Sequence, residues 1–456
     1  MVRRRLACAL ACALAAALGA TLTGCTLITD SFLTNEFSGD PFPVRVDTTS
    51  GALLVGVRQS NETEERVAVL DLLSPFTVSV IDSDPADPRL DPRVLFLDLT
   101  LLGERGPGEL DLPRARFPEA QVISLHPCAR ECSADDDTCD AQTCNVGVPG
   151  GERPFQAIIG ADVLAGDAVR LRLGDDQLFI LADIGGSDRN RSFACDAVFN
   201  SPYRGGGTLV VSGTELPFGN RRITLQACLG PEPDPALPLS PDQRGADVLL
   251  VASTSIGVSI LGEAAYERYR GAHLGAIPPI PPLGALTESS VFLPSGLVTG
   301  RIAKVDALAL VATSTSNALA PCRQVYAHHL LTDADCDRST DSGVDCPCPQ
   351  SDTFCSVPAI LELAPELGID FLVVPDDDPT LQALRTELRP DQPEVDGLLG
   401  TAALRAAEID VDYPHDRLLA RCAAGHCIAR PQLAETGDRD QVTGCLGGQP
   451  TGPTQR

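Results

Sequence analysis

Residues 68–77, AVLDLLSPFT, decide the fold of this 456-residue chain. Apolar residues up to Leu70 lead to a single acid, Asp71, and a second apolar run begins at Phe76 after a Ser-Pro pair. Short apolar runs bounded by turn residues predict β-strands. One strand therefore delivers a carboxylate into a turn and a second strand leaves it. We expect Asp71 to be buried at the edge of a cleft.

One pattern occurs twice, 240 residues apart. Residues 157–164, AIIGADVL, precede an alternating strand and a turn, and residues 395–400, VDGLLG, precede a similar strand. The matched pairs are Gly160 with Gly400, Leu164 with Leu404, Val169 with Ile409, Leu171 with Val411 and Leu178 with Leu418. A fixed offset across a strand, a short helix and a hairpin indicates an internal duplication.

A duplicated chain needs a second copy of the Asp71 turn. Residues 247–258, DVLLVASTSIGV, again bring an apolar strand to a small polar turn, and residues 263–270 predict a short helix behind it. Aligned on this order of elements, Ala252 takes the position of Asp71.

These motifs resemble the aspartic proteases of the pepsin and retropepsin families, whose active-site loop reads apolar-apolar-Asp-Thr-Gly-Ser/Ala. Asp71 and Ser74 match this pattern, whereas Leu72 and Leu73 stand where Thr and Gly belong. The resemblance covers about residues 45–422, through short motifs only. It implies an all-β fold with a few short helices, built from two pseudo-symmetric aspartic-protease-like β-barrel lobes.

The expected boundaries are lobe 1 at residues 44–204 and lobe 2 at residues 205–434, followed by a polar C-terminal tail at 435–456. Within lobe 1, residues 46–51, VDTTSG, have only a superficial likeness to the protease loop, and we interpret them as a hairpin turn. Within lobe 2, Asp378-Pro379 predicts the start of a helix, because Asp is a good N-cap and Pro suits the first helical position.

The predicted chemistry is incomplete. Aspartic proteases use two neighbouring carboxylates that share one proton. Asp71 is the candidate catalytic residue, but Ala252 supplies no acid, and Asp247 lies about 16 Å further back along its strand. The sequence favours a catalytically inactive protein with a binding or structural role. An active endopeptidase that pairs Asp71 with an unidentified second acid, a turn-capping role for Asp71, and an unrelated all-β surface or adhesion lipoprotein remain alternatives.

The N-terminus predicts export. Three arginines at 3–5 precede an apolar Ala/Leu run and the sequence Leu-Thr-Gly-Cys that ends at Cys25. This pattern is typical of a signal peptide, and its ending resembles a bacterial lipobox. The resemblance implies a signal peptide at 1–24, lipid attachment at Cys25, a tether over 25–43 and a place in the cell envelope, on the periplasmic face or outer surface of the outer membrane. An ordinary secretory signal or a short membrane anchor is the alternative.

Cysteine usage agrees with export. Of 17 cysteines, two lie in the signal peptide and one is Cys25, which leaves 14. An even number in an oxidising compartment predicts disulfides, although spacing does not give their pairing. The candidates are Cys128, Cys132, Cys139, Cys144, Cys195, Cys228, Cys322, Cys336, Cys346, Cys348, Cys355, Cys422, Cys427 and Cys445. Their spacing does not fit a structural zinc site, and we expect neither a metal nor another cofactor.

Charge limits the partners. The formal net charge is −27, and removal of the three signal-peptide arginines takes it to −30. A strongly acidic surface argues against nucleic acid as a partner. The expected partners are the membrane, through lipidated Cys25, and a peptide or protein ligand in the inter-lobe cleft.

Overall fold

The computed structural model describes the following residues: 41–48, 50–59, 65–80, 93–103, 114–125, 157–181, 199–201, 206–211, 213–219, 221–230, 245–273, 279–293, 296–312, 321–322, 325, 358–363, 368–387, 394–413, 417–423 and 427–431. Within them, no helix is long and apolar enough to cross a membrane.

Lobe 1 is built on a seven-stranded sheet with the order β2-β3-β4-β8-β5-β7-β6. Its strands are β2 (Arg45–Val46), β3 (Leu53–Gln59), β4 (Arg66–Leu70), β5 (Thr77–Val80), β6 (Arg93–Leu102), β7 (Arg114–Leu125) and β8 (Ala157–Ile159). Strand β8 lies between β4, to which it is parallel, and β5, to which it is antiparallel. The Asp71 turn connects β4 to β5 and therefore wraps around the end of β8.

Lobe 2 repeats this arrangement in an eleven-stranded sheet with the order β17-β18-β21-β16-β22-β15-β14-β19-β20-β25, with β11 also paired to β14. Its strands are β11 (Asn200–Ser201), β14 (Thr224–Gly230), β15 (Ala246–Ala252), β16 (Ser259–Gly262), β17 (Thr287–Leu293), β18 (Gly296–Val305), β19 (Ala307–Val311), β20 (Pro358–Leu363), β21 (Ile369–Val374), β22 (Gly397–Leu399) and β25 (Cys427–Pro431). Strand β22 is parallel to β15 and antiparallel to β16, as β8 is to its two neighbours.

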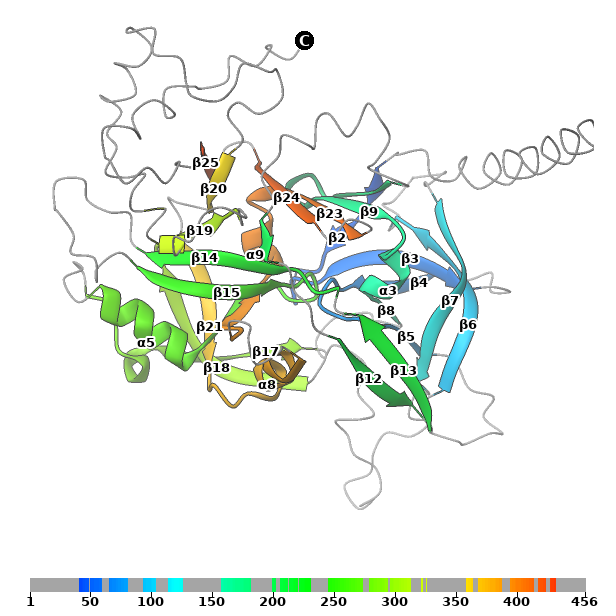
Figure 1. Cartoon of the computed structure of the whole chain (residues 1–456), viewed down its shortest axis with the longest axis horizontal. Coiled ribbons are helices and arrows are strands. Elements are labelled where there is room, and N and C mark those ends of the chain that lie inside the picture. The colour runs from blue at the N-terminus through cyan, green and yellow to red at the C-terminus, as the bar shows by residue number, and fades with distance from the viewer. Residues whose placement is uncertain are drawn as a thin grey trace, which may run out of the picture.

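A third sheet joins the lobes, with the order β1-β10-β9-β23-β24. Its strands are β1 (Phe42–Pro43), β9 (Ala168–Arg172), β10 (Gln177–Leu181), β23 (Ala407–Asp412) and β24 (Arg417–Cys422). In Figure 1 it lies above and between lobe 2 on the left and lobe 1 on the right. Residues 42–43, which the sequence placed in the tether, belong to this sheet.

The pairing of β9 with β23 confirms the offset of 240. Val169 faces Val411 and Leu171 faces Ile409, so each pair maps onto the other when 240 is added or subtracted. Arg170 faces Asp410, its own equivalent, on the pseudo-twofold axis. Strand alternation buries Val169 and Leu171 in the main core and turns Arg170 to the opposite face, as a half-buried strand requires.

Short elements complete the described part. The helices are α3 (Ala161–Leu164), α5 (Glu263–Ala272), α8 (Pro379–Glu387) and α9 (Thr401–Leu404), with 3₁₀ turns η1 (Leu173–Asp175) and η3 (Leu283–Ala285). A separate hairpin of β12 (Gly206–Val211) and β13 (Thr214–Gly219) packs on lobe 1, where Phe218 meets Phe76 edge to face. The all-β, two-lobed fold expected from the sequence is confirmed, and an unrelated all-β surface protein is not supported.

The turn at residues 46–51 is a hairpin turn, as interpreted. Asp47 Oδ2 accepts hydrogen bonds from the backbone N–H and the hydroxyl of Ser50. The same turn reaches lobe 2, because Gly257 N–H donates to Ser50 O at 2.7 Å and Thr401 Oγ1 donates to Gly51 O. The turn therefore joins the two lobes.

Candidate functional site

Asp71 stands where the sequence placed it, at the end of β4. Its backbone N–H donates to Ile159 O at 2.9 Å, and its Oδ1 accepts a hydrogen bond from Leu73 N–H at 2.9 Å. The residue is only 1% exposed. The loop thus holds a carboxyl group inside the protein, with one oxygen engaged by its own backbone.

The lobe 2 counterpart of Asp71 is Ser253, which corrects the alignment on Ala252. In lobe 1, Leu70 pairs with Ile159, and in lobe 2, Ala252 pairs with Leu399, so Ala252 corresponds to Leu70. Ser253 N–H donates to Leu399 O at 2.9 Å, just as Asp71 N–H donates to Ile159 O. The offset in this half of the lobe is 182, and the aligned position still carries no acid.

The next residue, Thr254, makes the link between the two loops. Its hydroxyl donates to Leu70 O at 2.5 Å and accepts from Leu72 N–H at 3.1 Å. Leu72 has no hydroxyl with which to return this bond. The Ser-Thr-Ser run at 253–255 was the sequence signal for this residue, because its Thr follows the position equivalent to Asp71, as Thr follows Asp in the aspartic-protease pattern that the loop resembles.

Burial dominates the electrostatics of Asp71. Loss of hydration raises the pKa of its carboxyl from 3.8 to about 6, against the smaller opposing effects of the Leu73 N–H, the Ser255 hydroxyl, the Arg222 charge and the Ser74 N–H. Its Oδ2 has no hydrogen-bond partner within the described part of the chain. The hydroxyl of Tyr413 is also buried, and its pKa is raised first by burial and then by the charge of Asp71.

Two described acids outside the loop, Asp162 and Asp247, have partners other than Asp71. Asp162 Oδ1 and Oδ2 bind the hydroxyl and N–H of Thr77 at 2.7 and 2.9 Å. Asp247 Oδ1 accepts from Cys322 N–H at 2.7 Å. No carboxyl is among the groups that shift the pKa of Asp71. Likewise, no cluster of three or more His, Cys, Asp or Glu suited to a metal occurs in the residues that the structure describes.

Leu73 fills space between the lobes. It is 7% exposed and belongs to a hydrophobic cluster that is otherwise made of lobe 2 residues, including Ile256 and, from α8, Leu381 and Leu384. The aspartic-protease pattern that the loop resembles has Gly at this position, which has no side chain to fill the space beside the carboxyl group. Here a leucine side chain occupies it.

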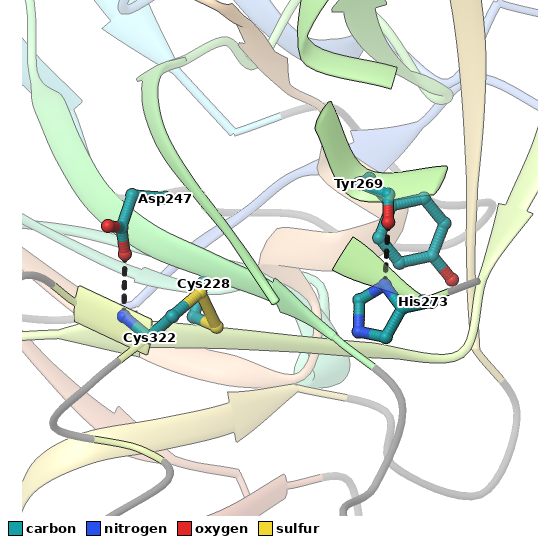
Figure 2. The surroundings of a disulfide bond; sticks show 5 residues. All are labelled: Cys228, Asp247, Tyr269, His273 and Cys322. Atoms are coloured by element: carbon teal, nitrogen blue, oxygen red, sulfur yellow. Dashed lines mark hydrogen bonds between the residues drawn. A yellow bond between two sulfur atoms is a disulfide. The ribbon is translucent and has the colours of Figure 1, made fainter. Parts of the chain in front are cut away.

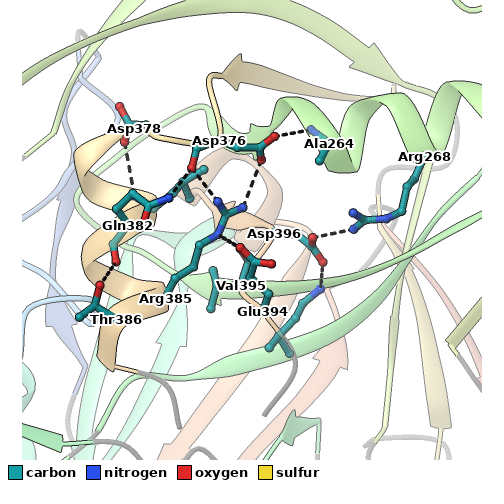
Figure 3. Close-up of polar contacts among 12 residues, drawn as sticks. Ala264, Arg268, Asp376, Asp378, Gln382, Arg385, Thr386, Glu394, Val395 and Asp396 are labelled. Atoms are coloured by element: carbon teal, nitrogen blue, oxygen red, sulfur yellow. Dashed lines mark hydrogen bonds and ion pairs between the residues drawn. The ribbon is translucent and has the colours of Figure 1, made fainter. Parts of the chain in front are cut away.

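Helix α8 is fixed at both ends. Asp378 Oδ1 accepts hydrogen bonds from the N–H groups of Thr380 and Leu381, which confirms the predicted N-cap. Arg385, which is 12% exposed, binds Asp376, Glu394 and the Val395 carbonyl (Figure 3). The last helical residue, Glu387, forms an ion pair with Arg222.

Four of the candidate cysteines form two disulfides. Cys228 in β14 is joined to Cys322, and Cys422 in β24 is joined to Cys427 in β25. Figure 2 shows the first of these, with the Asp247 carboxylate bound to the Cys322 N–H beside it. The other ten candidates, and Cys25 with its predicted lipid attachment, lie outside the described residues.

The sequence reasoning missed Arg222 and Tyr413. Arg222 Nε donates to Leu73 O at 3.0 Å, across 149 positions of sequence. Tyr413 follows β23 directly, and its pKa is raised by burial and by the charge of Asp71 in the other lobe. Neither residue belongs to a local motif, and only the tertiary fold brings them to the Asp71 loop.

No family model matches the chain, and no curated protein matches it. Among solved structures it is similar to basic 7S globulin from soybean, with 12% identity, 84% of this chain and 94% of that chain covered, and a TM-score of 0.38. Conglutin gamma, a basic 7S globulin from lupine seeds, is similar with 10% identity, 84% of this chain and 94% of that chain covered, and a TM-score of 0.39. An aspartic proteinase from Irpex lacteus is similar with 10% identity, 84% of this chain and 97% of that chain covered, and a TM-score of 0.35.

Proposed function

We propose that this chain is an exported, lipid-anchored envelope protein in which an aspartic-protease-like fold serves a binding or structural role without proteolysis. The observation that carries the proposal is Ser253 at the position equivalent to Asp71. A general-base carboxylate and a proton-sharing acid are both required for the family chemistry. A serine hydroxyl, with a pKa far above that of a carboxyl group, cannot share a proton with Asp71 in this way.

Burial supports the same proposal. Asp71 is 1% exposed and Leu73 occupies the side of the loop that faces lobe 2. A catalytic carboxylate must come within hydrogen-bond reach of a substrate or its attacking water. The partner we propose is an extended peptide or protein segment held between the lobes, with strand addition as the mode of recognition.

Proteolysis is tested with the mature full-length protein and an unfolded protein substrate between pH 3 and 7. We expect no cleavage above background at any pH, and no difference between the wild type and Asp71→Asn. Cleavage at acid pH that Asp71→Asn abolishes would show an active endopeptidase with an unidentified second acid, and would overturn the proposal.

The lipid anchor is tested separately in a bacterial host with a lipoprotein pathway. Incorporation of labelled palmitate and recovery in the membrane fraction are expected for the wild type. The variant Cys25→Ser should incorporate no label. Cys8→Ser, which changes a cysteine within the expected signal peptide, is the control and should be labelled like the wild type. Labelling that persists in Cys25→Ser would contradict the assignment of Cys25.

A further inference from the structure

Leu73 links Asp71 to the opposite lobe through three different groups. Its N–H donates to Asp71 Oδ1 at 2.9 Å, and its carbonyl accepts from Arg222 Nε at 3.0 Å. Its side chain lies in the lobe 2 cluster that contains the α8 residues Leu381 and Leu384. Displacement of α8 would therefore disturb the residue that holds the Asp71 carboxyl group.

Arg222 extends this link to the end of α8. Its side chain is 10% exposed and pairs with Glu387, whose side chain is 20% exposed. A single guanidinium group thus binds the lobe 1 loop and the last residue of a lobe 2 helix. Removal of one partner from a largely buried ion pair destabilises the fold more than removal of one partner from an exposed pair does.

We propose that Arg222, Glu387 and Leu73 form a latch that holds α8 against the Asp71 loop, and that ionisation of Asp71 favours opening of the latch. Opening would admit water to the loop and give the proposed ligand access to the space between the lobes. The ligand access rests on the proposed function, whereas the latch itself is a property of the free protein.

The direction of the pH effect on the latch follows from the groups that face Asp71 in the described structure. Its own loop contributes the N–H groups of Leu73 and Ser74, and the lobe 2 loop contributes the Ser255 hydroxyl. The segment before β14 contributes the charge of Arg222. Tyr413, which follows β23, feels the charge of Asp71. Arg222 itself faces Glu387.

Desolvation outweighs all the groups that favour the anion, because the pKa of Asp71 in the closed protein is about 6 and its ordinary value is 3.8. Water admitted by opening would restore a lower pKa. The closed state therefore binds the proton more tightly, and a rise in pH through 6 shifts the equilibrium toward the open state.

Hydrogen exchange of the full-length protein tests the latch, with rates corrected for the intrinsic effect of pH. Between pH 5 and pH 7.5 we expect about a tenfold loss of protection in peptides that cover residues 70–76 and 380–387. This size applies when opening hydrates Asp71 fully and so returns its pKa to the ordinary value. Peptides from β9 should keep their protection. In Asp71→Asn the loss with pH should disappear, because nothing titrates at that position.

Removal of the ion pair gives the second arm. Arg222→Gln and Glu387→Gln should each lower protection in both segments at both pH values. Arg268→Gln removes an ion pair of lobe 2, to Asp396, through an arginine that is 49% exposed, and should leave both segments unchanged. Unchanged protection in Arg222→Gln and Glu387→Gln, or an equal loss with pH in Asp71→Asn and the wild type, would overturn the proposal.

Discussion

Asp71 is an acid in a place where its charge is poorly supported. One oxygen accepts a backbone N–H, but burial raises the pKa to about 6 despite that bond and the nearby Arg222. The protonated form is therefore the more compatible with the folded state. This costs the protein stability at neutral pH.

The change Asp71→Asn should remove that cost. Because the pKa rises from 3.8 in the unfolded chain to about 6 in the fold, the stabilising effect of protonation is complete below pH 3.8 and is lost as pH rises through 6. Relative to the variant, the wild type should lose about 3 kcal/mol of unfolding free energy between pH 3.5 and pH 7.5. Urea titrations of both proteins measure this difference, in which the titrations of other groups cancel. A parallel dependence of the two proteins on pH would contradict it.

Gly51 is a second residue whose position in the fold determines which amino acid can stand there. Its φ is +72°, and a Cβ added there would lie 2.1 Å from the Gly257 Cα in the opposite lobe. Gly51→Ala should reduce the unfolding free energy by about 3 kcal/mol, from backbone strain together with the collision. Gly213→Ala is the matched control, since Gly213 has φ +81° and nothing within 4 Å of an added Cβ. Equal losses in the two variants, measured by urea unfolding, would show that the close approach is not important.

At the scale of elements, helix α8 could be predicted from the sequence and its place could not. An Asp-Pro pair and leucines at 381 and 384 predict an N-capped amphipathic helix, and the structure has both features. The contacts of Arg222 and Glu387 join segments 165 positions apart, which local patterns do not encode.

Asp378→Ala tests the cap of α8. Loss of the hydrogen bonds from Thr380 and Leu381 to the Asp378 carboxylate should cost about 1 kcal/mol of unfolding free energy. Thr386→Ala, in an exposed position near the other end of the same helix, should change it by less than about 0.5 kcal/mol. Thermal or urea unfolding checks both, and a loss in Asp378→Ala no larger than in the control would contradict the capping role.

The strands that carry the loops show where sequence reasoning was limited. The order of strand, turn and strand was predicted correctly in both lobes. The lobe 2 counterpart was displaced by one residue, because the uninterrupted apolar run of 248–252 fixes a strand but not its register. Register came from the pairing of Ala252 with Leu399, a contact across 147 residues.

At the scale of the whole molecule, the shared sheet holds the two lobes together. Arg170 binds Asp410 through two hydrogen bonds, of 2.6 and 2.8 Å, with the Asp410 side chain 4% exposed. Arg172 pairs with Glu408 nearby, in a more exposed position. Bidentate arginine–carboxylate pairs fix the relative orientation of the two side chains as well as pairing their charges.

A double-mutant cycle on Arg170→Met and Asp410→Leu should show coupling of about 1–3 kcal/mol. The double variant should lose less unfolding free energy than the sum of the losses in the two single variants. The corresponding cycle on Arg172→Met and Glu408→Leu should give less than about 1 kcal/mol, because solvent screens Arg172. Urea unfolding measures all the variants. A coupling near zero for the first pair would contradict a role in joining the lobes.

The position of the Arg170–Asp410 pair also bears on how the two halves of the chain came to pair with each other. Residues 170 and 410 are equivalent in the two halves and face each other on the axis that relates them. In a dimer of identical halves the same residue would meet its own copy, so two arginines or two aspartates would repel. The opposite charges at these two equivalent positions therefore favour contact between the two different halves over contact between two copies of the same half.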